Sequence, residues 1–184
     1  MNPILRYTAT YGLLSGLATC AVLIAGFTLQ DHLSAVHQLW FGYLVMLVIL
    51  TFIFVGMKRY RDIERGGVIR FLPALGLGLA IAGAAGVAYA LLWEVYLAAT
   101  NYSFMDTYTA SILRQAKAAG LSGEKLAQKV AELETMRKNY ANPLFRIPMT
   151  FIEIFPVGLV VALLSAVSLR FPKFLPARAV KSAA

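Results

Sequence analysis

Cysteine and histidine are nearly absent from this chain. Its 184 residues include one cysteine, Cys20, and two histidines, His32 and His37. A single cysteine excludes an intrachain disulfide, and we expect Cys20 to pack as a small side chain within an apolar run. The histidines are poorly spaced for two ligands on one helix face, and no HExxH pattern is present. The sequence therefore predicts solvated loop histidines and no metal site.

Catalytic motifs are missing as well. The chain has no Ser/His/Asp or Cys/His set, no dinucleotide fingerprint and no paired aspartates of the kind used in lipid-phosphate transfer. The segment 56–67, GMKRYRDIERGG, lacks both the GxxxxGK pattern and the preceding strand of a phosphate-binding loop. We therefore expect the protein not to be an enzyme and to need no cofactor.

Long apolar runs are what the chain has in abundance, because 59% of its residues are hydrophobic. A helix needs about 20 apolar residues to cross a bilayer. Runs of roughly this length lie at about 7–29, 39–57, 71–99 and 147–169. The first run has no convincing small-x-small cleavage site, so it is interpreted as a span and not as a signal peptide. The predicted fold is all-α: a single integral membrane domain over 1–184, built as a four-helix bundle.

Positive charge borders these runs, and the formal net charge is +8. The cations outside the third connection are Arg6, Lys58, Arg59, Arg61, Arg65, Arg70, Arg170, Lys173, Arg178 and Lys181. The positive-inside rule places both termini, the 58–70 loop and the basic tail 170–184 in the cytoplasm. The connection between the third and fourth runs, residues 101–146, carries seven cations of its own, which favour the opposite orientation. This connection is long and also contains acidic residues, so the positive-inside rule applies to it less strongly.

The cations are not interleaved with exposed aromatics, so nucleic acid is not the expected partner. Anionic lipid explains them better. The residues predicted to form a cytoplasmic lipid-headgroup loop are Lys58, Arg59, Tyr60, Arg61 and Arg65.

The stretch 101–146 has the periodicity of two helices. Apolar residues recur at helical spacing at Met105, Tyr108, Ile112 and Ala116, and again at Leu126, Val130, Leu133 and Met136. Gly120 suits the end of the first helix, Ser122 the cap of the second, and Asn142-Pro143 its end. We expect an extramembrane helical hairpin, which serves either as a structural cap over the bundle or as a docking surface for a protein partner.

Small residues form stripes along the spans, and such stripes let helix backbones approach closely in lipid. The stripes are Gly12 and Gly16; Gly76, Ala80, Ala84 and Ala88; Gly78, Ala82, Gly86 and Ala90; and Gly158 and Ala162. The third span is therefore expected at the centre of the bundle, where leucine at Gly83 or Gly86 should not fit. The stripes serve packing within the monomer or, alternatively, a homo-oligomer.

Two acidic residues inside the apolar runs, Glu94 and Glu153, are the main functional lead, since a carboxyl group in lipid is costly. Glu94 precedes Asn101 by seven residues and Glu153 follows Arg146 by seven, so both are predicted about 10 Å from the same polar boundary. One interpretation is a shared proton or cation site. The alternative is that Arg146 or Lys138 pairs with one carboxylate, which makes each glutamate structural.

Pro156 lies one turn after Glu153 and frees a backbone carbonyl, which predicts a kink in the last span. Together with Thr150, the segment resembles the broken-helix sites of transporters. Thr150, Pro156 and Arg146 are therefore predicted to belong to the candidate site.

Three segments resemble the bacterial membrane proteins grouped as domain of unknown function 4199. They are GMKRYRD…GG at 56–67, Trp93-Glu94, and NPLFR…TFIEIFPVGL at 142–159. The matching positions are Gly56, Arg59, Tyr60, Arg61, Asp62, Gly66, Gly67, Glu94, Asn142, Pro143, Glu153, Pro156 and Gly158. The resemblance covers nearly the whole chain and implies a four-span inner-membrane protein with a charged hairpin, but no activity.

Three functions remain open at this point. The favoured one is a non-enzymatic accessory or scaffolding subunit that presents the hairpin or the basic loop to a partner. The alternative is a small proton- or cation-coupled transporter that uses Glu94 and Glu153, and a membrane enzyme acting on lipid comes last.

Overall fold

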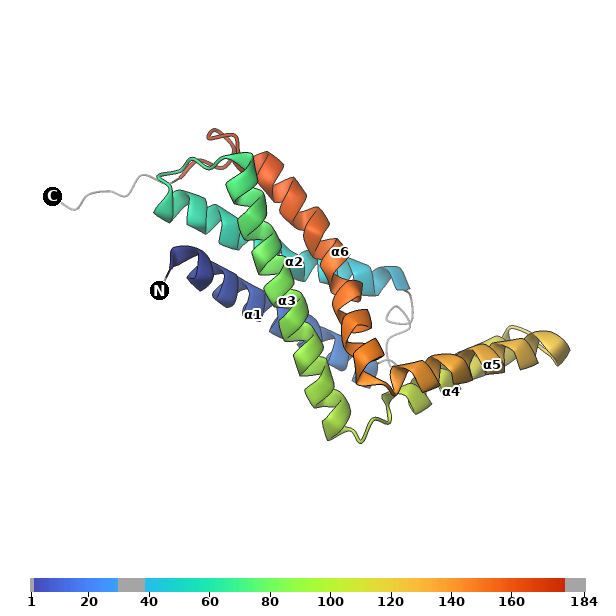
Figure 1. Cartoon of the computed structure of the whole chain (residues 1–184). Coiled ribbons are helices and arrows are strands. Elements are labelled where there is room, and N and C mark those ends of the chain that lie inside the picture. The colour runs from blue at the N-terminus through green and yellow to red at the C-terminus, as the bar shows by residue number, and fades with distance from the viewer. Residues whose placement is uncertain (1, 30–38, 178–184) are drawn as a thin grey trace. The chain divides into compact units, whose positions relative to one another are not determined.

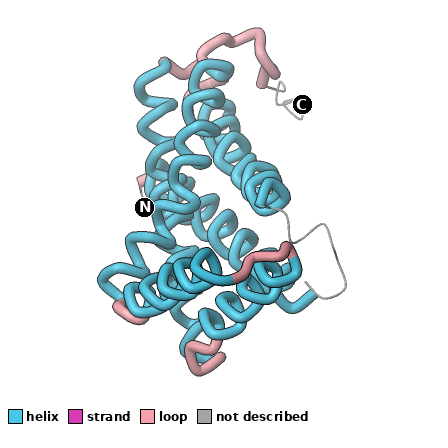
Figure 2. The backbone as a smooth tube through the Cα atoms, turned by 90° about the vertical axis from the view of Figure 1, so that its right-hand side faces the viewer, coloured by secondary structure: helices cyan, strands magenta, loops and turns pink. Residues whose placement is uncertain are grey.

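The computed structural model describes residues 2–29 and 39–177, and the secondary structure in these ranges is helical (Figures 1 and 2). The helices are α1 (Pro3–Leu29), α2 (Leu39–Glu64), α3 (Phe71–Ala99), α4 (Phe104–Ala118), α5 (Gly123–Tyr140) and α6 (Pro143–Leu169). Residues outside the described ranges include His32, His37, Arg178 and Lys181.

Within the described residues, α1, α2, α3 and α6 are long and apolar enough to cross a membrane. The surface of these helices also favours a lipid environment. Large apolar side chains such as Leu17, Val48 and Leu164 are exposed, and water is a poor solvent for them. The all-helical class is thus confirmed, and these four helices suggest a multi-pass membrane protein.

Two helix ends differ from the prediction. The 58–70 segment was expected to be a loop, but α2 continues to Glu64, supported by an ion pair between Lys58 and Asp62 one turn apart. The last helix starts at Pro143 and not near 147, because the Asn142 side chain accepts the Leu144 N–H, and proline suits the first helical position. The hydropathy of the sequence predicts the limits of the apolar run, whereas local ion pairs and capping hydrogen bonds determine how far the helix extends beyond it.

The chain divides into two compact units, and α3 and α6 each belong to both. Unit 1 comprises Met1–Tyr89 and Phe151–Ala184, and unit 2 comprises Ala90–Thr150.

Glycines of α1 and α3 allow close helix packing in unit 1. A Cβ on Gly12 would lie 2.5 Å from the Ala84 Cβ, and one on Gly16 would lie 2.6 Å from the Ala88 Cβ. On another side of α3, a Cβ on Gly86 would lie 2.7 Å from the Phe151 ring. Small residues of α3 therefore pack closely against other helices of the same chain, as the stripes predicted for these positions.

Two glycines of α3 do not behave as predicted. Gly76, which begins one predicted stripe, has no atom within 4 Å of the position that a Cβ would occupy. Gly83 has no atom within 4 Å of the position that a Cβ would occupy, so leucine has space there. The prediction for Gly83 is wrong because the rotation of α3 turns that residue away from its neighbours, whereas Gly86, less than one turn later, faces Phe151.

In unit 2, α4 and α5 pack side by side as a helical pair (Figure 1). Met105 and Leu133, one from each predicted apolar stripe, are buried. Gly120 has φ 84°, and the Leu121 N–H bonds the Ala116 carbonyl, which is the glycine-ended helix terminus that the sequence predicted. Ser122 occupies the cap position of α5 without a side-chain hydrogen bond.

Candidate functional site

Glu94 forms an ion pair with Arg146 inside unit 2. The Arg146 Nε donates to one carboxylate oxygen at 2.6 Å, and Nη2 donates to the other at 2.6 Å. Arg146 is only 2% exposed. This two-point geometry, in which a planar guanidinium matches a carboxylate, is the strong form of such a pair. Both oxygens of Glu94 are therefore engaged by one cation.

Two tyrosine rings flank the same guanidinium. The Arg146 Cζ lies 5.2 Å from the ring centre of Tyr102 and 5.6 Å from that of Tyr140. Its Nη1 also donates to the Tyr140 backbone carbonyl at 2.8 Å. Cation–π contacts and a backbone acceptor stabilise a charge that has lost its water. We call Glu94, Tyr102, Tyr140 and Arg146 the Arg146 cluster.

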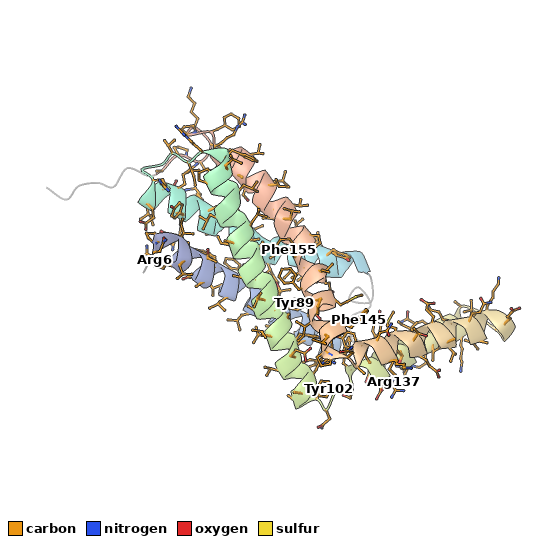
Figure 3. All side chains as sticks on the ribbon, in the orientation of Figure 1. Arg6, Tyr89, Tyr102, Arg137, Phe145 and Phe155 are labelled. Carbon is orange, nitrogen blue, oxygen red and sulfur yellow. The ribbon has the colours of Figure 1, made fainter. Side chains whose placement is uncertain are left out.

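The backbone that places Tyr102 is unusual. Asn101 and Tyr102 have φ values of 50° and 56°, in the left-handed region. The Tyr102 N–H bonds the Leu97 carbonyl and the Asn101 N–H bonds the Ala98 carbonyl, so α3 closes with a terminus normally made by glycine. This reversal puts Tyr102 at the end of α3 (Figure 3). Left-handed tyrosine is strained, and its contact with Arg146 is a favourable interaction that opposes the strain.

Trp93 extends the cluster into α3. The Trp93 indole N–H donates to the Tyr140 hydroxyl at 2.6 Å, and the Trp93 ring packs edge-on against Phe104. Trp93 and Glu94 thus bind the end of α5 and the start of α6 through neighbouring positions of α3. Together with the contact between Trp93 and Phe104, the cluster joins the four helical segments of unit 2.

The remaining candidate residues lie along α6. Thr150 is buried, and its hydroxyl donates to the Arg146 carbonyl at 2.9 Å, a common bond within a helix. Pro156 lies in a helix that continues unbroken to Leu169, so the structure does not contain the broken helix that the sequence suggested.

Glu153 has a different environment from Glu94. It belongs to unit 1, is exposed, and has no ion pair among the described residues. Its carboxylate accepts a hydrogen bond from Tyr89 on α3, whose side chain is 2% exposed. Neighbouring exposed residues of α6, such as Ile152 and Val160, are apolar. Glu153 is therefore an acidic group on an apolar surface.

A second buried arginine lies in the predicted lipid-headgroup loop. Arg61 is 0% exposed, and its Nη1 and Nη2 donate to the backbone carbonyls of Phe174 and Leu175 at 3.0 and 2.6 Å. Its Nε donates to Asp62 at 2.7 Å. Arg61 thus attaches the segment after α6 to α2. The other buried residue of the predicted loop, Tyr60, packs edge-on against Tyr7.

The other cations of that loop differ in exposure. Lys58 pairs with Asp62 and is half-buried. Arg59 and Arg65 are exposed, and each donates to a tyrosine hydroxyl, at 3.4 Å to Tyr11 and 3.2 Å to Tyr60. Two of the five predicted headgroup residues are therefore buried among protein groups.

Sequence reasoning missed Tyr102, Tyr140 and the role of Arg61. A signal existed for the tyrosines, because aromatic residues flank both ends of the hairpin and Arg146 follows closely. No such signal exists for Arg61, whose partners are backbone carbonyls more than a hundred residues away. Among the described residues, no group of three or more His, Cys, Asp and Glu side chains could hold a metal ion.

Comparison with known families agrees with the resemblance. Residues 10–170 match the family described as Protein of unknown function (DUF4199). The chain belongs to this family. The match includes α3, α6 and the whole Arg146 cluster, so DUF4199 encompasses both candidate glutamates. No curated protein and no solved structure matches the chain.

Proposed function

We propose that this DUF4199 protein is a non-enzymatic accessory or scaffolding subunit of a bacterial inner membrane. Both termini and the end of α2 are cytoplasmic in this proposal, and the α4–α5 pair lies outside the membrane, where it binds a protein partner. The lipid bilayer is the other partner, and neither nucleic acid nor a cofactor is involved.

The state of Glu94 is the observation that carries this proposal. A coupling glutamate in a transporter must bind and release an ion, whereas both oxygens of Glu94 are held by a buried arginine between two tyrosines. Releasing this carboxylate would leave a buried charge unpaired, which costs about 3–5 kcal/mol. The cluster therefore supports a structural role that sets the base of the α4–α5 pair.

The surface of α4 and α5 supports the extramembrane location. Both side chains of the Asp106–Arg137 ion pair are more than half exposed, and the Lys129–Glu132 pair is partly exposed. Figure 3 shows Arg137 on this helical pair. Charged side chains at this density are costly in lipid, whereas they favour an aqueous surface that a partner can bind.

Photo-crosslinking in intact cells tests the partner. A photoreactive residue at the exposed positions Lys125 or Gln128 should capture one and the same protein, and one at Leu164 on the apolar face of α6 should capture lipid. Capture of a second copy of the chain would indicate a homo-oligomer. If the α5 positions react only within their own chain, the scaffolding proposal fails.

Cysteine labelling tests the orientation. A cysteine at the exposed Ser122 should react with an impermeant maleimide in intact spheroplasts, and the control Cys20, which is buried, should not. Reaction at Ser122 only after lysis would place the α4–α5 pair in the cytoplasm and overturn the proposed topology.

Proton- or cation-coupled transport is the second candidate, and one observation favours it. Glu153 is an exposed acid without an ion pair among the described residues, so it could exchange a proton more readily than Glu94. Purified protein in proteoliposomes should then conduct protons, and Glu153→Gln should abolish the flux while Glu134→Gln on α5 leaves it unchanged. No flux from the wild type would exclude this candidate.

A further inference from the structure

Three parts of unit 1 that are distant in sequence meet at the end of α2. Arg61 binds the carbonyls of Phe174 and Leu175, and a Cβ on Gly67 would lie 3.3 Å from the Ala177 Cβ. The turn after α2 and the segment after α6 therefore lie at the same end of the unit (Figure 1). Arg6 brings the start of α1 there as well, through an ion pair with Glu64 at 2.8 Å.

The cations at this end fall into two groups. Arg61, Lys58 and Arg6 have acidic or backbone partners, so their charges hold unit 1 together. A second group is exposed and has no ion pair among the described residues. We call this group the basic end: Arg59, Arg65, Arg70, Arg170 and Lys173.

Exposed apolar side chains lie between these cations. Val68 is 55% exposed and Leu72 is 74% exposed, on either side of Arg70. Phe171 and Phe174 flank Lys173 and are 49% and 43% exposed. Alternating cations and apolar groups at the end of apolar spans match the boundary between lipid headgroups and acyl chains.

We propose that the basic end is a binding site for the phosphate group of an anionic phospholipid. Arg70, Lys173 and Arg170 contact the phosphate, while Val68, Leu72 and Phe171 contact the upper acyl chains. Arg61 is a positioning residue, because it holds the segment carrying Lys173 against α2 without being exposed itself. This proposal depends on the membrane assignment and is independent of the partner proposed for α4 and α5.

Native mass spectrometry of the full-length protein tests the site, with phosphatidylglycerol and phosphatidylcholine as probes. The wild type should retain phosphatidylglycerol preferentially. In the variant Arg70→Gln/Lys173→Gln, the ratio of retained phosphatidylglycerol to phosphatidylcholine should fall about fivefold for each cation removed, since a cation near the surface contributes about 1 kcal/mol. The control Arg114→Gln/Lys125→Gln removes two exposed cations from α4 and α5 and should keep the preference.

Arg61→Lys separates positioning from charge, because it keeps the charge but replaces the planar guanidinium, which donates from separate nitrogens, with a single ammonium. It should lower the phosphatidylglycerol preference while leaving the retention of phosphatidylcholine unchanged. Equal preference in the wild type and Arg70→Gln/Lys173→Gln, or an equal loss in the control, would overturn the proposal. Displacement of the lipid by millimolar inorganic phosphate would also overturn it, since the site would then bind free phosphate.

Discussion

Units 1 and 2 are held together by different chemistry. Unit 1 depends on close backbone approach, since Gly12 and Gly16 let α1 approach α3, and on charged groups at the end of α2, where Arg61 donates to two backbone carbonyls. Unit 2 depends on side chains, since one ion pair and two tyrosine rings surround Arg146. Unit 1 should therefore be sensitive to volume added at these glycines as well as to a change of Arg61, whereas unit 2 should be sensitive mainly to loss of the Arg146 charge.

The largest effect is expected from Arg146→Ala. This change leaves Glu94 without its cation and should destabilise unit 2 by about 3 kcal/mol, the lower end of the range for buried pairs because Glu94 is partly exposed. Unfolding in bicelles, followed through the fluorescence of Trp93 in a Trp40→Phe background, measures it. Arg146→Lys should recover part of the loss. A change below about 1 kcal/mol, the value of a surface pair, would show that the cluster does not hold unit 2.

Arg61→Lys should have the next largest effect, within unit 1. Loss of the two-point contact with the Phe174 and Leu175 carbonyls should cost about 1.5–3 kcal/mol, the range for hydrogen bonds from a charged group. Hydrogen exchange should become faster in the segment after α6 while α4 and α5 stay unchanged. Unchanged exchange in that segment would mean that Arg61 does not attach it.

Gly16→Ala tests the packing of α1 on α3. The added Cβ would lie 2.7 Å from the Ala85 carbonyl oxygen, so the backbones must separate, at a cost of about 1–3 kcal/mol. Gly83→Ala is the matched control, because nothing lies within 4 Å of its Cβ position. It should be neutral or stabilising by up to about 1 kcal/mol. Equal destabilisation by both changes would contradict the observed rotation of α3.

The smallest effect is expected at the pair of Asp106 and Arg137. Both side chains are more than half exposed, so Arg137→Gln should cost about 0.5 kcal/mol and only at low salt. Thermal unfolding at two salt concentrations measures it. A loss as large as that of Arg146→Ala would remove the distinction between surface pairs and the Arg146 cluster.

The helices could be predicted from the sequence because the residues that mark each helix lie within or beside it. Apolar runs predict four spans, and Gly120 ends α4 by a backbone conformation that glycine adopts easily. The rotation of α3 has no such local signal. Both Gly83 and Gly86 are glycines in the same apolar run, so the sequence does not distinguish them. Only the packed structure shows that Phe151 covers Gly86 and that Gly83 is open.

The candidate site was predictable only in part. The sequence indicated that Arg146 could pair with one glutamate, but the choice of Glu94 depends on contacts 52 residues apart. Tyr102 reaches the cluster because its backbone is left-handed. Tyrosine rarely adopts this conformation, so the residue type does not predict it. Arg61 was predicted to bind lipid headgroups, because charge is visible in a sequence and burial against backbone carbonyls is not.

The central claim is that Glu94 forms a structural ion pair with Arg146. Two double-mutant cycles in bicelles test it most directly, one combining Glu94→Gln with Arg146→Gln and one combining Glu94→Gln with Glu153→Gln. The account predicts a coupling of about 2 kcal/mol in the first cycle and additivity within about 0.5 kcal/mol in the second. Additivity of Glu94 with Arg146, together with strong coupling between the two glutamates, would contradict it.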